Sequence, residues 1–127
     1  MRVVSLNRAR AQTVQIQGRS VMTAIGKRPV EQRVAVGALG LEGDEQADPA
    51  VHGGLSKAVY AYPVEHYPFW QTVRAQARVS LWDEPLPRGL LGENLTLEGL
   101  LESQVWVGDM LCFPDCVLAV SEPRFPC

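Results

Sequence analysis

The sequence predicts a mainly β domain with a few helices (α+β class), folded as a barrel or a sandwich. Short β-rich segments recur along the chain, and turn residues separate them at close spacing. Only one stretch places apolar and aromatic residues at helical spacing. The 127 residues suffice for one core, and no linker divides them, so residues 1–127 are predicted to form a single domain.

The predicted strands near the N-terminus cover residues 2–6, 13–17, 21–25 and 31–36. Residues 13–17 alternate apolar and polar side chains before Gly18, and residues 21–25 are β-rich and end before Gly26. A long irregular section then covers residues 37–55 and is rich in glycine and acidic residues. Loops of this length are usually functional or disordered, and the apolar residues spread through this one argue against disorder.

A further strand is predicted over residues 57–62, followed by the helical stretch. Pro63 suits the first turn of a helix, and apolar residues recur at helical spacing as far as about residue 78. Pro68 lies inside this run, which predicts either a kink or a short turn followed by a main helix that begins at Pro68.

The last third of the chain is predicted to consist of a proline-rich loop and short strands. The loop covers residues 82–88, and the strands cover residues 94–97, 104–107, 110–113 and 117–121. Gly108-Asp109 is a strong turn dipeptide between two of these strands. The final strand leads directly into the terminal residues 121–127.

Charge and hydropathy exclude several classes of protein. The formal net charge of −2 gives no general footprint for nucleic acid or a membrane surface. No apolar run approaches the roughly 18 residues of a membrane span, and residues 1–8 lack the apolar core of a secretion signal. We therefore expect a cytoplasmic protein without nucleic-acid or membrane partners.

The three cysteines do not form a disulfide framework, because their number is odd. Cys112 and Cys116 flank the turn residues Pro114 and Asp115. This pair is either two metal ligands or two small apolar residues at a hairpin. The second explanation is favoured because the sequence holds no second ligand pair.

The third cysteine, Cys127, lies three residues after Arg124 on a stiff segment. Pro123 and Pro126 fix their own φ angles and favour extended conformations in the residues that precede them. A guanidinium near a thiol favours the thiolate, which is the form that attacks electrophiles or binds metals. The alternative is an ordinary tail with an incidental cysteine.

Three further residues are candidates for ligand binding. His52 precedes two glycines, where backbone can approach a ligand closely, and could donate to an anion, relay a proton or bind a metal. Asn94 can both donate and accept hydrogen bonds, as a heterocycle edge requires, and Lys27 at a strand end could hold a phosphate. Each also has a plainer explanation, as a loop histidine, a turn asparagine and a solvated basic edge.

Taken together, the motifs of this chain resemble those of a known family. The segments that carry the resemblance are Gly43-Asp-Glu-Gln-Ala-Asp48, Val51-His-Gly-Gly54, Lys57-Ala-Val-Tyr60, Gly92-Glu-Asn-Leu95, Val107-Gly-Asp109 and Pro123-Arg-Phe-Pro-Cys127. In this order they resemble the MOSC domain, the molybdenum cofactor sulfurase C-terminal domain, and most closely its YiiM-type bacterial members linked to hydroxylaminopurine resistance. The resemblance covers residues 3–127.

The resemblance implies a β-barrel with a few helices and a pterin-bound molybdenum cofactor (molybdopterin). In the family, the cysteine of the Pro-Arg-x-Pro-Cys motif is the proposed molybdenum ligand or sulfur carrier, and that position here is Cys127. The same motif places Arg124 against the anionic cofactor. Lys27, His52 and Asn94 fall at positions expected to hold the pterin or its phosphate.

The implied reaction reduces an N–OH group of a small-molecule substrate, such as an N-hydroxylated base, to N–H and releases water. Asp44, Glu93 or His52 could supply protons, and a separate flavin or iron–sulfur partner would supply electrons. The alternatives are a carrier that hands on cofactor or sulfur without turnover, and an inactive fragment. YiiM-type chains continue beyond the motif cysteine, so we expect a barrel that is incomplete at its C-terminus, with exposed apolar edges.

Overall fold

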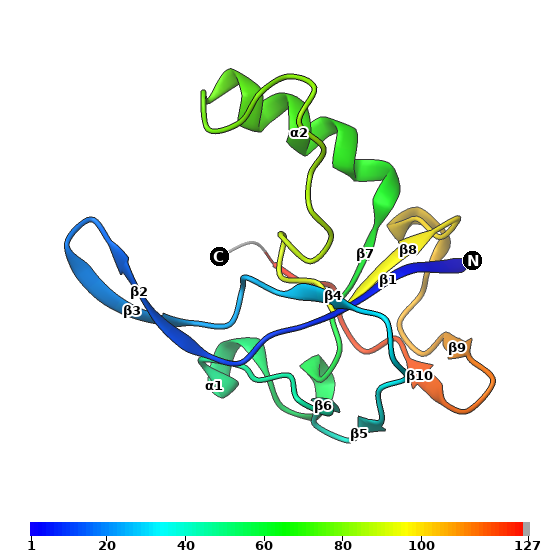
Figure 1. Ribbon diagram of the computed structural model, residues 1–127. Helices are drawn as coiled ribbons and strands as arrows, with labels where there is room; N and C mark the ends of the chain where they lie inside the picture. The colour runs from blue at the N-terminus through cyan, green and yellow to red at the C-terminus, as the bar shows by residue number, and fades with distance from the viewer. Residues whose placement is uncertain (126–127) are drawn as a thin grey trace.

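The computed structural model describes residues 1–125 and is built mostly of short strands (Figure 1). The strands are β1 (Arg2–Arg8), β2 (Gln12–Ile16), β3 (Arg19–Thr23), β4 (Arg28–Val30), β5 (Val36–Gly37), β6 (Gly40–Leu41), β7 (Ala61–Pro63), β8 (Leu95–Glu98), β9 (Met110–Cys112) and β10 (Val117–Ala119). The helices are α1 (Pro49–His52) and α2 (Tyr67–Gln76), with 3₁₀ turns η1 (Leu55–Lys57), η2 (Val64–His66) and η3 (Glu102–Gln104).

One four-stranded sheet organises the molecule, with the strand order β4-β1-β8-β7. β1 pairs antiparallel with β4 on one side and with β8 on the other, so Leu6 lies opposite both Val30 and Leu95. β7 pairs in parallel with β8 and forms one edge of the sheet. The central position of β1 and β8 brings residues from opposite ends of the chain into contact.

The other strands form three two-stranded ribbons, β2–β3, β5–β6 and β9–β10. The turn between β2 and β3 has positive φ at both Gln17 (51°) and Gly18 (76°), as a tight hairpin of matching twist requires. This hairpin extends away from the main sheet (Figure 1). The mainly β prediction with few helices is confirmed, while the strands of residues 1–125 do not close into a barrel.

For the predicted helix, the expected alternatives were a kink at Pro68 and a short turn followed by a main helix. A single 3₁₀ turn, η2, leads into α2, and Pro68 lies in the first turn of α2, where its missing N–H costs nothing. The prediction of a short turn followed by a main helix at Pro68 is therefore confirmed. α2 ends at Gln76, and Arg78 then adopts a positive φ of 58°.

Three predicted strands are wrong or shifted. Residues 31–36 are irregular except at Val36, and the strand that pairs with β1 is β4, which contains Pro29. Proline is tolerated there because β4 is an edge strand. The strand expected over residues 57–62 is confined to β7, and residues 104–107 follow η3 without forming a strand.

The centre of the molecule is small and unusually polar. The buried apolar residues are Ala24, Leu41, Tyr67, Ala75, Leu86, Leu95 and Leu97. The largest fully buried side chains are instead those of Asn7, Glu93 and Thr96. Because buried polar groups must be hydrogen-bonded, these three side chains require partners in the folded chain. Within residues 1–125, no helix is long and apolar enough to cross a membrane.

Gly89 provides a test of the close contact between two loops at this centre. Its φ is +82°, and an added Cβ would lie 2.6 Å from the carbonyl oxygen of Lys27. We expect Gly89→Ala to lower the free energy of unfolding by about 3 kcal/mol, because the strained φ and the backbone clash add. Gly108→Ala is the matched control: φ is +97° but nothing lies within 4 Å, so about 1 kcal/mol is expected. Equal losses in urea denaturation would contradict the contact.

Candidate functional site

The terminal segment and the His52 loop meet at one point of the molecule. Arg124 donates from Nη2 to Nδ1 of His52 at 2.9 Å, and its guanidinium carbon lies 4.8 Å from the ring centroid of Tyr60. A guanidinium has no acceptor, so His52 accepts with Nδ1, and its ring proton is on Nε2. The result is a cation held over an aromatic face beside an imidazole.

Additional contacts hold the terminal segment against residues 51–57. The Oγ atom of Ser56 donates to Glu122 at 2.9 Å, and Lys57 lies 3.8 Å from the same carboxylate. Lys57 also donates to the carbonyl of Val51 at 3.2 Å. Ser121 donates from Oγ to the carbonyl of Ser56. These contacts fix the position from which Arg124 reaches His52.

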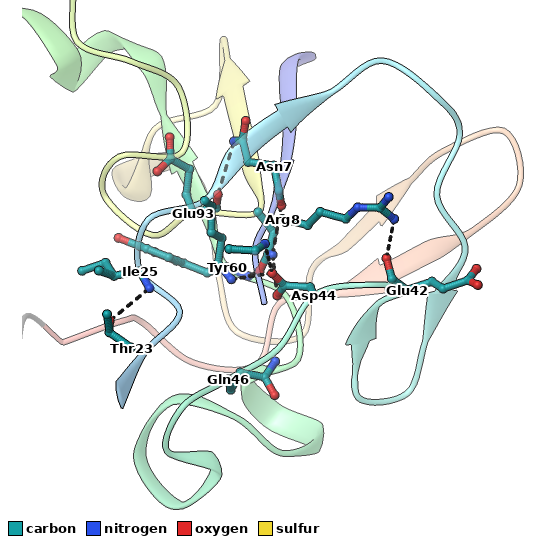
Figure 2. Close-up of polar contacts among 12 residues, drawn as sticks. Asn7, Arg8, Thr23, Ile25, Glu42, Asp44, Gln46, Tyr60 and Glu93 are labelled. Carbon is teal, nitrogen blue, oxygen red and sulfur yellow. Dashed lines mark hydrogen bonds and ion pairs between the residues drawn. The ribbon is translucent and has the colours of Figure 1, made fainter. Parts of the chain in front are cut away.

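A buried carboxylate, Asp44, anchors the N-terminal part of the same long loop (Figure 2). Its Oδ1 accepts from the Lys27 ammonium at 2.6 Å and from the Ala9 backbone N–H at 2.9 Å. Its Oδ2 accepts from Asn94 Nδ2 at 2.9 Å. The side chains of Lys27 and Asp44 are only 7% and 1% exposed, so this is a buried ion pair. Three segments distant in sequence converge on this one carboxylate.

A second buried carboxylate, Glu93, lies next to this network. Its Oε1 accepts from the Tyr67 hydroxyl, from the Gly89 N–H at 3.0 Å and from the Thr96 hydroxyl at 2.9 Å. The Asn7 amide in turn donates to Thr96 Oγ1 at 3.1 Å and to the Glu93 carbonyl at 3.2 Å. The other carboxylate oxygen, Oε2, has no partner among the described residues. Glu93 thus holds the residue 89–93 turn against β8 and α2.

Two tyrosines at these networks have strongly perturbed acidity. Burial raises the pKa of Tyr60 to about 12, with a further increase from Tyr62 and an opposing effect of Arg124. Burial and the hydrogen bond to Glu93 raise the pKa of Tyr67 to about 12. Both phenols therefore stay neutral at physiological pH, and Tyr67 acts as a hydrogen-bond donor to a carboxylate.

The predicted ligand residues fall into two groups. His52 and Arg124 are in direct contact, whereas Lys27 and Asn94 meet at Asp44 in the buried network. Cys127 lies outside the described residues. A cofactor-binding role for any of these residues stays a prediction.

Three residues that shape this region had no predicted role. Tyr60, the aromatic face under Arg124, ends one of the quoted motifs, which was its only signal. Asn7 and Thr96 lie within strands and carried no signal, because their importance comes from partners that are 86 or more residues away or on another strand. Asp44 was named only as a candidate proton donor, and its side chain joins three segments.

An open groove of about 760 Å³ begins at this cationic end. Tyr60, Arg124 and Lys57 line one part of it. Most of the remaining lining is apolar, although it includes Glu102 and Glu122, and it comes largely from β7, residues 100–102, residues 105–107 and residues 117–123. One end of the groove is therefore charged and aromatic, and the rest of its lining is mainly apolar.

The residues at the cationic end fit an anionic, planar cofactor. Arg124 uses one of its five N–H donors on His52 and keeps a guanidinium fork suited to phosphate-like oxygens. Gly54 has a positive φ of 86°, and a Cβ added there would meet nothing within 4 Å, so the backbone beside His52 is open to a ligand. Among residues 1–125, no group of three or more His, Cys, Asp or Glu side chains could hold a metal ion.

Comparison with known proteins gives consistent matches. The MOSC domain is matched by residues 48–127. YflK of Bacillus subtilis is 42% identical over 125 residues, covering 98% of this chain and 53% of YflK. A protein named Reductase from Gibberella moniliformis is 37% identical over 111 residues, covering 87% of this chain and 19% of that protein.

A solved structure shares the fold. The crystal structure of YiiM from Geobacillus stearothermophilus matches with a TM-score of 0.68 at 34% identity, covering 98% of this chain and 52% of that chain. This chain therefore spans about half the length of both YflK and YiiM.

The Asp44–Lys27 pair is predicted to be essential for folding. Asp44→Ala leaves the Lys27 ammonium buried without its counter-charge, and we expect a loss of about 3–5 kcal/mol in urea denaturation. Adding Lys27→Met should recover part of this loss because the uncompensated charge is removed. The matched control is Asp115→Ala, which breaks an exposed pair with Arg33 and should cost under about 1 kcal/mol. Similar losses for Asp44→Ala and Asp115→Ala would contradict the buried pair.

Alkaline pH should destabilise the chain through Tyr60 and Tyr67. Their pKa values of about 12 in the folded chain exceed the usual 10.0, so the folded state keeps protons that the unfolded state releases. The stabilisation is fully present below pH 10 and is lost as pH rises through 12. Urea midpoints measured across this range should fall, and Tyr60→Phe should reduce the slope. An unchanged slope in that variant would show that Tyr60 is not the source.

Proposed function

This chain belongs to the MOSC domain family, and we propose that it binds a molybdenum cofactor and serves the reduction of N-hydroxylated bases or related compounds. The observation that carries this proposal is the contact of Arg124 with both His52 and Tyr60. The guanidinium of Arg124 and the ring of Tyr60 line one open groove, and the imidazole of His52 contacts that guanidinium. This combination suits an anionic, flat ligand.

Each residue at this end has a distinct proposed role. Arg124 binds an anionic group of the cofactor with the donors that His52 does not use. Tyr60 stays neutral and holds the guanidinium over its ring, which limits the orientations that Arg124 can adopt. Cys127, three residues after Arg124 in the sequence, is the proposed metal or sulfur site, and a guanidinium close to it would favour its thiolate.

Lys27 and Asn94 are also proposed cofactor ligands, but their side chains already have hydrogen-bond partners in the folded chain. Both side chains are engaged with Asp44, and the Lys27 ammonium is almost fully buried. Direct contact with a cofactor requires an exchange of these hydrogen bonds. Their contribution in the folded chain is to hold the residue 44 segment, and through it the loop that carries His52.

The proposed reaction is balanced as R–NHOH + 2e⁻ + 2H⁺ → R–NH₂ + H₂O. The bound cofactor would supply the two electrons, renewed by a separate flavin or iron–sulfur protein. His52, which contacts the groove-lining Arg124, is the proposed proton donor. Glu93 and Asp44 are less suited to this step because both carboxylates are already held by three donors each inside the molecule.

The enzyme role is supported by the relative named Reductase, which is 37% identical to this chain. The second candidate is a carrier that holds cofactor or sulfur without turnover.

Cofactor loading in a host that makes molybdopterin tests the proposal. We expect about one molybdenum per chain by metal analysis, as a single thiolate ligand indicates. Arg124→Ala should lower the retained molybdenum about tenfold or more, because a charge-assisted contact is lost. The control is Arg33→Ala, an exposed arginine outside the groove, which should load normally. Purified chain without molybdenum would argue against both the enzyme and the carrier.

Reduction of hydroxylaminopurine with an artificial electron donor then separates the two candidates. An enzyme forms the amine and loses this activity in Cys127→Ala. A carrier retains molybdenum but forms no amine.

A further inference from the structure

A connected row of aromatic side chains leads from the proposed cofactor site to α2. Arg124 lies over the ring of Tyr60 at 4.8 Å, and the ring centroids of Tyr60 and Tyr62 are 6.1 Å apart. Trp70 on α2 donates from Nε1 to the Tyr62 hydroxyl at 2.6 Å. The ring of Phe69 lies edge-on to that of Trp70, with centroids 5.2 Å apart. Direct contacts therefore connect Arg124 with the surface of α2.

The α2 end of this row is open to solvent. Phe69 is 62% exposed, and Trp70 is half-buried beside it. Arg74 follows Trp70 by four residues, so the two side chains are neighbours on the helix surface. No carboxylate of residues 1–125 pairs with the Arg74 guanidinium. This part of α2 thus presents two aromatic rings beside a cation, and these residue types are enriched at protein interfaces.

The stoichiometry of the proposed reduction favours a flavin as the electron donor. A reduced flavin hydroquinone releases two electrons and two protons when it is oxidised, so one flavin balances one turnover. The sum is FlH₂ + R–NHOH → Fl + R–NH₂ + H₂O. An iron–sulfur centre that passes single electrons requires two encounters for each substrate. The flavin ring is also planar and aromatic, which suits contact with exposed aromatic side chains.

We propose that the Phe69–Trp70–Arg74 surface of α2 docks an acidic flavoprotein, and that the aromatic row carries its electrons to the cofactor site. Arg74 pairs with a carboxylate of the partner, while Phe69 and Trp70 contact the exposed edge of its flavin. The flavin is oxidised and releases its protons to solvent, and the aromatic rings of the row end unchanged. A surface of this small size fits the brief encounters of electron-transfer partners. The inference rests on the proposed function for the identity of the electron acceptor.

Docking is measured on the chain without cofactor, so this test does not require molybdenum. Hydrogen exchange with oxidised flavodoxin, an acidic flavin protein, should slow at residues 67–76. Arg74→Glu should weaken binding in calorimetry at least about tenfold, because it repels an acidic partner. Arg74→Gln is a milder change and should weaken binding in the same direction. The control is Arg19→Glu on the exposed β2–β3 hairpin, far from α2 (Figure 1), which should change the affinity less than about twofold.

Electron delivery is measured on the molybdenum-loaded chain with two donors. Dithionite is small and needs no docking surface, whereas reduced flavodoxin is expected to use α2. Trp70→Leu interrupts the row and should lower the flavodoxin-driven rate at least about tenfold, while the dithionite-driven rate changes less than about twofold. Trp70→Phe keeps an aromatic ring at this position and should recover part of the loss.

Three outcomes would overturn the proposal. One is hydrogen exchange at residues 67–76 that flavodoxin leaves unchanged. Another is an equal loss of both rates in Trp70→Leu, which would identify a purely structural role. The third is protection of residues 67–76 by an acidic ferredoxin and not by flavodoxin, which would identify an iron–sulfur donor.

The two arms also separate this inference from the proposed function. A chain that retains no molybdenum but binds flavodoxin at α2 would contradict the proposed function and support the docking surface. A loaded chain that reduces substrate with dithionite but does not bind flavodoxin would contradict the docking surface alone.

Discussion

The carboxylate of Asp44 is the contact on which the rest of the arrangement depends. It receives donors from Ala9 at the end of β1, from Lys27 before β4 and from Asn94 before β8. The backbone hydrogen bonds between strands fix the order of β4, β1 and β8. They do not fix the conformation of the loops at the strand ends. A single buried acceptor with three donors determines these loops, because any displacement leaves a buried donor unsatisfied.

Polar contacts replace part of the apolar core in this molecule. Asn7, Glu93 and Thr96 are fully buried and hydrogen-bond to one another, while many large apolar side chains remain on the surface. Buried polar networks of this kind contribute more to a unique arrangement than to net stability, because desolvation offsets much of the attraction. The chain therefore has a well-specified centre and a periphery with unsatisfied apolar surface, which is the combination expected of a fold that makes further contacts.

The sequence predicts the parts of this structure that depend on local chemistry. Pro68 marks the start of α2, and the glycine at residue 18 marks the β2–β3 turn, because backbone dihedrals are a local property. His52 and Arg124 could be named as candidates only through the ordered motifs, which did not predict that the two side chains contact each other. For Lys27 and Asn94, the sequence predicts a ligand role from side-chain chemistry alone. Both side chains hydrogen-bond to Asp44, and this shared partner could not be predicted because it depends on the tertiary fold and not on sequence spacing.

Contacts on both sides of α1 explain why the side chain of His52 has a defined position although its loop is irregular. Asp44 fixes the segment before α1, and the Lys57–Glu122 and Ser56–Glu122 contacts fix the segment after it. Between them, Asp48 caps α1 by accepting from the Ala50 N–H, so the turn that ends at His52 has a defined direction. The second anchor includes the terminal segment itself, which means that the contact positioning the loop also positions Arg124. The imidazole and the guanidinium are therefore held relative to each other rather than to distant parts of the sheet, and their 2.9 Å contact depends on few intervening residues.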